Sequence, residues 1–121
     1  MLFATLAAIN AFIAVAAGAF GAHGLKSRLT PEMLVTFETG ARYHMYHSLA
    51  LFAVAWLVTR GGAGVKLAGL GGWAFLAGIV LFSGSLYAYS LTGVRSLAII
   101  TPLGGLAFLV GWVLVAIAAS R

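Results

Sequence analysis

Long apolar stretches separated by short polar segments make up nearly the whole chain. Four of them are long enough to form helices that cross the hydrocarbon core of a bilayer, which takes about 20 residues. We therefore predict an all-α integral membrane protein, a single domain over residues 1–121 built as a bundle of four transmembrane helices. The expected spans are residues 2–22, 43–59, 65–91 and 101–119.

The second predicted helix begins well before its apolar stretch. Thr30 is a typical N-cap residue, Pro31 suits the first helical turn, and Glu32 would lie near the positive end of the helix dipole. From this start to residue 42, apolar and charged positions fall mostly on opposite sides of a helical wheel. We therefore predict an amphipathic extension over residues 31–42, continuous with the span over 43–59.

Two further signals concern the third and fourth spans. Tyr87 and Tyr89, near the end of the third span, are typical of an aromatic belt at the membrane interface. Thr101 and Pro102 form a cap-plus-proline start for the fourth span. Within that span, Trp112 is predicted to pack against a neighbouring helix or to contact lipid.

The composition restricts the protein to the membrane. Only 7% of the residues are charged and 63% are hydrophobic, with a mean hydropathy of +1.09. A soluble domain of this size could not bury so much apolar surface, whereas a bilayer solvates it. The first stretch has no basic residue before it and is long for a signal peptide, so we expect it to be a retained helix.

The residue types that are missing exclude several kinds of chemistry. The chain contains no cysteine and no aspartate. Thiolate metal sites, disulfides, cysteine nucleophiles and aspartate-completed catalytic triads are therefore excluded. The net charge of +5 comes mostly from residues at predicted helix ends and in loops, where they would meet lipid headgroups. Because the basic residues form no clustered face, we expect no nucleic-acid partner.

Small residues recur at four-residue spacing in three of the predicted spans. Such stripes allow two helix backbones to approach closely in lipid. Asn10 lies on the stripe of the first span, where it would form a hydrogen bond across the helix contact. We expect tight packing within the bundle, and self-association, from these residues: Asn10, Ala14, Gly18, Ala22, Gly64, Ala68, Gly72, Ala107 and Gly111.

The polar residues that could carry chemistry are few and gather mainly in the second predicted helix. Ionisable residues within a membrane are costly and often functional, although the cost is much smaller near the interface. Glu38 and Arg42 are spaced for an ion pair, and His44 and His47 lie on neighbouring sides of one helix. The candidate polar site comprises His23, Glu38, Arg42, His44, His47, Ser83 and Ser85.

This polar group is open to several interpretations. In the simplest, the ion pair lies among the headgroups, the histidines cap or bridge helices, and the two serines form helix–helix hydrogen bonds. Alternatively, His23, His44 and His47 bind zinc or copper, or two of these histidines ligate haem. In a fourth interpretation, His44 and Glu38 relay protons or gate a path for a small solute. We predict no metal site, no cofactor and no catalytic residue.

The chain also carries four distinctive stretches: Gly18–Leu25, Ala41–Ala50, Leu81–Tyr87 and Thr101–Gly105. In this order they resemble the signature of the YgdD-like family of small bacterial inner-membrane proteins, which has a related eukaryotic transmembrane protein. The resemblance covers essentially the whole chain and implies a four-helix protein of the cytoplasmic membrane. The family is described as a domain of unknown function, so the resemblance implies no catalytic role for any residue.

These observations favour a non-enzymatic membrane protein, either an accessory subunit or a small oligomeric scaffold, with lipids and other membrane proteins or further copies as partners. The chain has abundant helix-packing surface and no complete catalytic or ligand set. The alternative is a small oligomeric transporter or channel for a small solute or proton, because four short helices alone enclose little volume. A third interpretation is a haem- or metal-binding membrane protein.

Overall fold

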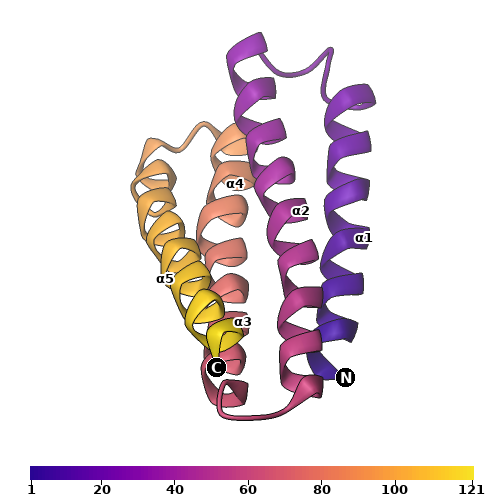
Figure 1. Ribbon diagram of the computed structural model, residues 1–121. Helices are drawn as coiled ribbons and strands as arrows, with labels where there is room; N and C mark the ends of the chain where they lie inside the picture. The colour runs from indigo at the N-terminus through magenta and orange to yellow at the C-terminus, as the bar shows by residue number, and fades with distance from the viewer.

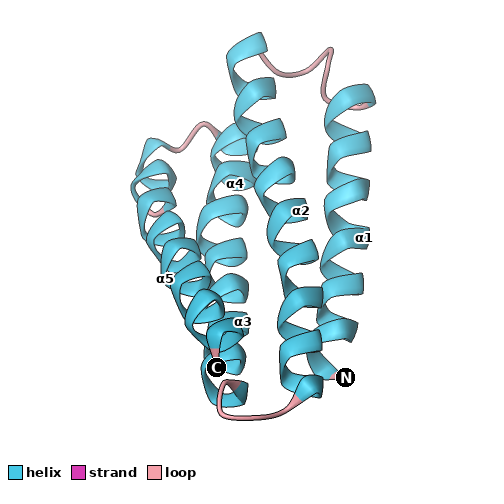
Figure 2. Ribbon diagram, in the orientation of Figure 1, coloured by secondary structure: helices cyan, strands magenta, loops and turns pink.

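The computed structural model describes residues 1–121 and consists of helices joined by short connections (Figure 2). In chain order the elements are α1 (Leu2–His23), α2 (Pro31–Arg60), α3 (Val65–Gly78), η1 (Ile79–Ser83), α4 (Gly84–Thr92), η2 (Arg95–Ile99) and α5 (Thr101–Ser120). The element η1 is a π-helical turn and η2 is a 3₁₀ turn. No strand is present, so the predicted all-α class is confirmed.

The elements form four rods that run alternately up and down (Figure 1). The elements α3, η1 and α4 follow one another without a break and make up the third rod, while α1, α2 and α5 are the other three. Both termini lie at the same end of the bundle, and the start of α2 extends beyond the other rods at the opposite end (Figure 1). The predicted number of helices is therefore confirmed.

Three of the four rods are long and apolar enough to cross a membrane. They are Leu2–His23, Val65–Thr92 and Arg95–Ser120, and at most 33% of the most apolar part of each is buried inside the protein. Large apolar side chains such as Phe12, Leu109 and Val113 therefore face outward. The α2 rod, which carries four charged residues, is not among the three; its crossing of the membrane remains a prediction.

The two ends of α2 follow from local sequence. The Thr30 hydroxyl accepts a hydrogen bond from the Met33 backbone N–H at 3.2 Å, and Pro31 occupies the first turn, as predicted. At the other end, Gly61 and Gly62 have φ angles of 80° and 90°, which only glycine adopts readily. The helix therefore ends at Arg60, and the chain turns directly into α3.

The start of α5 differs from the prediction. The helix begins at Thr101 with Pro102 in its first turn, but no side chain caps its N-terminus. The Thr101 hydroxyl instead lies 2.6 Å from the hydroxyl of Ser85 on α4. A partner on a neighbouring helix has replaced the local backbone N–H, so Thr101 joins two helices rather than capping one.

Small residues hold α5 against the third rod. A side chain at Gly64 would collide with the Ala118 carbonyl, one at Gly104 with the backbone of Phe82, and one at Gly111 with the Phe75 ring. These positions let the α3–η1–α4 rod and α5 approach closely, which in lipid is how helices gain packing energy.

The other stripe residues have varied surroundings. Ala68 is fully buried, Ala107 is partly buried, and Gly72 packs against Phe3 of α1. On α1 itself, Ala14 is buried, but Gly18 has open space beside it and Ala22 is exposed. A four-residue spacing drifts around a helix with 3.6 residues per turn, so a long stripe of this kind leaves the contact. The buried side of α1 instead follows Phe3, Ala7, Ala14 and Gly21.

Candidate functional site

Two buried histidines of α2 are the main polar groups inside the bundle. His44 and His47 are each 4% exposed, although the rods around them are almost wholly apolar. They lie three residues apart and so point toward different neighbours. Since an unpaired polar group is costly in such surroundings, the partners of each ring nitrogen show what the histidine does.

His44 connects three helices. Its Nε2 lies 3.0 Å from Oδ1 of Asn10 on α1, and its Nδ1 lies 3.0 Å from the hydroxyl of Tyr87 on α4. The amide nitrogen of Asn10 already donates to the Leu6 carbonyl at 2.9 Å, which leaves Oδ1 as an acceptor. His44 therefore donates from Nε2, and Nδ1 accepts from Tyr87. The neutral imidazole satisfies both neighbours at once.

Local packing brings Tyr87 to His44. A side chain at Gly40 would lie 3.1 Å from the Tyr87 ring, so the glycine leaves the space that this ring occupies. On its other side, the ring lies 4.9 Å from that of Phe37, between centroids. The Tyr87 ring is therefore partly buried against α2, where its hydroxyl can bind His44, and its place in an interfacial belt stays a prediction.

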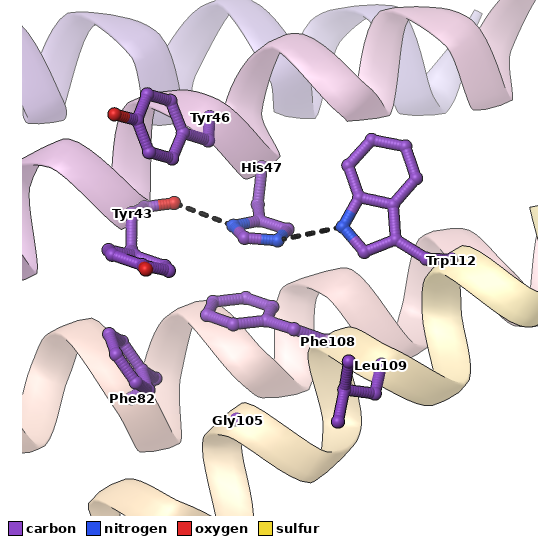
Figure 3. A pocket seen from close by; sticks show the side chains of 8 residues that line it. All are labelled: Tyr43, Tyr46, His47, Phe82, Gly105, Phe108, Leu109 and Trp112. Atoms are coloured by element: carbon purple, nitrogen blue, oxygen red, sulfur yellow. Dashed lines mark hydrogen bonds between the residues drawn. The ribbon is translucent and has the colours of Figure 1, made fainter.

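His47 is held by a different set of contacts (Figure 3). Its Nδ1 donates to the Tyr43 carbonyl at 2.7 Å, and its Nε2 accepts from the indole N–H of Trp112 on α5 at 3.2 Å. The ring stacks on Phe108, with 3.5 Å between centroids and 5° between planes. This ring is also neutral: a proton on Nε2 would face the Trp112 N–H and break that bond.

The arrangement leaves neither histidine with a free lone pair. A metal ion or haem iron at His44 would have to displace Tyr87, and one at His47 would have to displace Trp112. No group of three or more His, Cys, Asp or Glu side chains comes together to hold a metal. His23 is exposed at the end of α1, about 20 Å along that helix from Asn10 and hence from His44.

The charged residues of the candidate site lie apart from the histidine interior. Glu38 and Arg42 are both exposed, and the ion pair expected from their spacing is not formed. Exposed pairs on a helix gain only a few tenths of a kcal/mol, so competition from solvent or headgroups suffices to separate them. The pairing of His44 with Glu38 required for the proton-relay interpretation is also absent, because His44 bonds Asn10 and Tyr87 instead.

The two serines have different roles. The Ser85 hydroxyl donates to the Phe82 carbonyl at 2.9 Å and also meets Thr101, which ties α4 to α5 as predicted. The Ser83 hydroxyl is fully buried and has no hydrogen-bond partner. In an α-helix a serine commonly bonds the carbonyl four residues earlier. Within the π turn, that carbonyl, of Ile79, accepts from the Gly84 backbone N–H.

Sequence reasoning did not identify the partners of the histidines. The sequence pattern predicts Tyr87 at the membrane interface and Trp112 in helix packing or lipid contact, and it gives no sign of Phe108. The useful signal is that polar hydrogens in an apolar rod need acceptors, so tyrosine and tryptophan in spans should be matched with histidine and asparagine. To match Trp112 with His47, and Tyr87 with His44, one would also have to know how far each helix is shifted along the bundle axis, which the sequence does not give.

A lateral hollow of about 380 Å³ lies beside His47, between α2, η1 and α5. Figure 3 shows its side chains, with Tyr43 and Phe82 at one end, Trp112 at the other, and His47 near Phe108 between them. Six of its eight residues are hydrophobic and none is charged. The residues are Tyr43, Tyr46, His47, Phe82, Gly105, Phe108, Leu109 and Trp112.

The chain is similar to proteins named as membrane proteins. A family model described as "Protein of unknown function (DUF423)" matches residues 17–105. UPF0382 membrane protein YwdK of Bacillus subtilis (strain 168) is 50% identical over 125 residues, with 99% of this chain and 97% of the relative covered. UPF0382 membrane protein SAB0533 of Staphylococcus aureus (strain bovine RF122 / ET3-1) is 44% identical over 120 residues, covering 99% and 96%.

A third relative is the UPF0382 membrane protein of Haemophilus influenzae (strain ATCC 51907 / DSM 11121 / KW20 / Rd), 44% identical over 109 residues, with 90% of this chain and 86% of the relative covered. No solved structure matches the chain. The family model includes all four stretches that carried the resemblance, so a membrane family of unknown function is confirmed, while the YgdD-like name stays a prediction. Matched almost from end to end by such relatives, this multi-pass membrane protein belongs to the DUF423 (UPF0382) family.

Proposed function

We propose that the protein is a non-enzymatic accessory or scaffold protein of the cytoplasmic membrane. The observation that carries this proposal is the state of its interior: both ring nitrogens of His44 and of His47 are engaged with partners of the protein itself. Groups used in this way fix helices relative to one another and are not available to bind or activate a substrate. We therefore assign a structural role to His44 and His47, the main polar groups of the interior.

The membrane arrangement in this proposal has four crossings. The part of α2 over residues 43–59 carries no Asp, Glu, Lys or Arg, and it buries His47, Leu51 and Val54 against its neighbours. Such a segment, antiparallel to three apolar rods, belongs at the same depth. Residues 31–42 then form the amphipathic extension at the interface, with Phe37 and Ala41 inward and the charged side chains outward.

The partners in this proposal are lipids together with further copies or other membrane proteins. The outer surfaces of α1 and α5 are broad and apolar, with Phe12, Val15, Leu106 and Val113 all more than half exposed. Helices associate in lipid through shape and close packing rather than through charge. Because the buried histidines are fully engaged and the outer helix surfaces are broad and apolar, we propose that the protein acts by packing against lipids, further copies or other membrane proteins.

Native mass spectrometry after gentle extraction, from cells that express the protein at its natural level, tests the proposal. We expect a reproducible mass of several copies, or of the chain with a foreign membrane subunit, and the same mass for Arg42→Ala. A monomer in every mild detergent and in native nanodiscs would overturn it.

A flux assay addresses the transporter alternative. Proteoliposomes containing the protein should conduct protons and small solutes no faster than empty liposomes. Flux above that background, abolished when Glu38→Gln and His44→Ala are combined, would replace the scaffold proposal with transport. A double variant that folds normally and retains full flux would instead locate the path elsewhere and still overturn the scaffold role.

A further inference from the structure

The hollow beside His47 has the form of a site that opens to the bilayer rather than to water. His47 and Phe108, each 4% exposed, lie at its base. Leu109 and Tyr46, 65% and 50% exposed, lie at its rim on α5 and α2. Because no charged side chain lines it, the hollow offers nothing to a charged ligand and suits a neutral one.

The depth of the hollow follows from the His44–Asn10 hydrogen bond. Asn10 lies about 12 Å from the start of α1 and about 20 Å from its end, and so near the middle of this span. Tyr43 and Tyr46 lie within one helical turn of His44. Both tyrosines also belong to the first turn of the span over residues 43–59 proposed above, so they lie inside the hydrocarbon core on the side nearer the amphipathic extension.

Two hydroxyls at this depth require an acceptor. Neither the Tyr43 nor the Tyr46 hydroxyl forms a hydrogen bond within the protein, although both rings line the hollow. Water is scarce among lipid chains, and acyl chains carry no acceptor, so an unpaired hydroxyl there is costly. The other polar hydrogens nearby, on His47 and Trp112, are already engaged. A ligand that fits must bring an acceptor to the tyrosines.

The walls of the hollow favour a flat ligand. Five rings besides His47 surround it, and the Tyr43 and Phe82 rings lie 4.8 Å apart between centroids. Aromatic faces attract electron-poor planar rings through stacking. The volume of about 380 Å³ lies at the small end of ligand pockets and suits one or two fused rings, with any tail left in the bilayer.

We infer that this hollow binds the ring of a lipid-soluble quinone. Such a ring is planar, neutral and electron-poor, and it carries carbonyl oxygens that accept hydrogen bonds from the Tyr43 and Tyr46 hydroxyls. The inference concerns binding and is independent of the scaffold role proposed above.

The test uses Trp112 as a reporter that is part of the site. In a Trp56→Phe, Trp73→Phe variant in nanodiscs, Trp112 is the only tryptophan, and added decylubiquinone should quench its fluorescence with saturation. A variant retaining only Trp56, through Trp73→Phe and Trp112→Phe, reports quenching by quinone that merely diffuses in the bilayer. We expect this control to show no saturation, and equal, unsaturated quenching of both tryptophans would overturn the inference.

Further variants locate the binding. A Cβ at Gly105 lies 3.8 Å from Phe82, so Gly105→Leu is expected to fold, to fill the hollow and to abolish saturation. Gly69→Leu, at a glycine with open space on α3, is the matched control and should leave binding unchanged. Tyr43→Phe combined with Tyr46→Phe keeps both rings and should weaken binding about 10- to 50-fold, as expected for two lost hydrogen bonds.

The nature of the ligand is tested by competition. Decylbenzene has a similar ring and tail but no carbonyl, and it should displace decylubiquinone at least several-fold less well. Equal competition by decylbenzene, or saturation that survives Gly105→Leu, would show that the hollow does not recognise a quinone. Native masses of the variants, measured alongside, show whether binding and assembly fail separately.

Discussion

His44 and His47 are two similar side chains on one helix with very different surroundings. His44 lies among α1, α2 and α4, and its ring is bonded on both sides by side chains of other helices. His47 bonds its own helix on one side and the partly exposed Trp112 on the other, next to a hollow. The first region is a closed junction of three helices, whereas the second borders the lipid. Burial of a histidine in a membrane bundle therefore does not by itself separate structural positions from positions beside a site.

The largest effect that separates the His44 junction from the His47 region is expected when the His44 ring is removed. His44→Ala leaves Oδ1 of Asn10 and the Tyr87 hydroxyl without partners and creates a cavity, so we expect a loss of about 3 kcal/mol in the free energy of unfolding. The measurement is unfolding in mixed micelles, followed by circular dichroism as the denaturing detergent fraction rises. Arg42→Ala, at an exposed position two residues away, should change it by less than about 0.5 kcal/mol. Equal effects of the two substitutions would show that the junction is not a structural centre.

The second prediction concerns the helix that carries Trp112. Gly104→Ala forces α5 away from the backbone of Phe82 and should cost about 2 kcal/mol. Its neighbour supplies the control, since a methyl at Gly105 meets only ordinary contacts and should cost less than about 0.5 kcal/mol. The same unfolding assay applies, and Trp112 fluorescence should shift only in Gly104→Ala. If both variants behave alike, the close approach of α5 does not position Trp112.

A smaller loss of stability is expected when only one hydrogen bond of the His44 junction is removed. Tyr87→Phe keeps the ring but removes the donor to His44 Nδ1, so we expect a loss of about 1 kcal/mol. Because the two residues share one hydrogen bond, the loss from Tyr87→Phe should nearly disappear in a His44→Ala background. Additive losses in the double-mutant cycle would refute the bond.

The smallest effect is expected at the lipid border. Trp112→Phe removes the donor to His47 Nε2, but Trp112 is 45% exposed, and we expect a loss of about 0.5 kcal/mol. The comparison predicts that Tyr87→Phe is more destabilising than Trp112→Phe under identical conditions. The reverse order would mean that the His47 region, rather than the His44 junction, carries more of the stability.

The positions of the helices could be predicted largely from sequence, because each depends on local signals. Apolar length gives the spans, Thr30 and Pro31 give the start of α2, and the glycines after Arg60 permit its end. The π turn at η1 was not predicted: it meets Gly104 of α5 at the backbone of Phe82, and no local pattern indicates this contact between helices.

The candidate site could be predicted only in part. His44 and His47 stood out because ionisable residues are rare in apolar helices. Their partners Asn10, Tyr87 and Trp112 come from three other elements, and the match depends on how far each rod is shifted along the bundle axis. Glu38 and Arg42 show the opposite case, since their spacing suggested a pair that the exposed surface does not enforce.

The π turn also sets the rotational phase of the third rod. One residue corresponds to about 100° of rotation in an α-helix, so the wider turn at Ile79–Ser83 changes the direction in which every later side chain points. Phe75 before it points into the core, and Tyr87 after it reaches His44. Deleting one residue within the turn would restore ordinary helix and leave Tyr87 directed at His44, whereas closing the turn without a deletion would rotate Tyr87 by about 100°. A single extra residue thus lets one continuous rod present two differently oriented faces to the same neighbours.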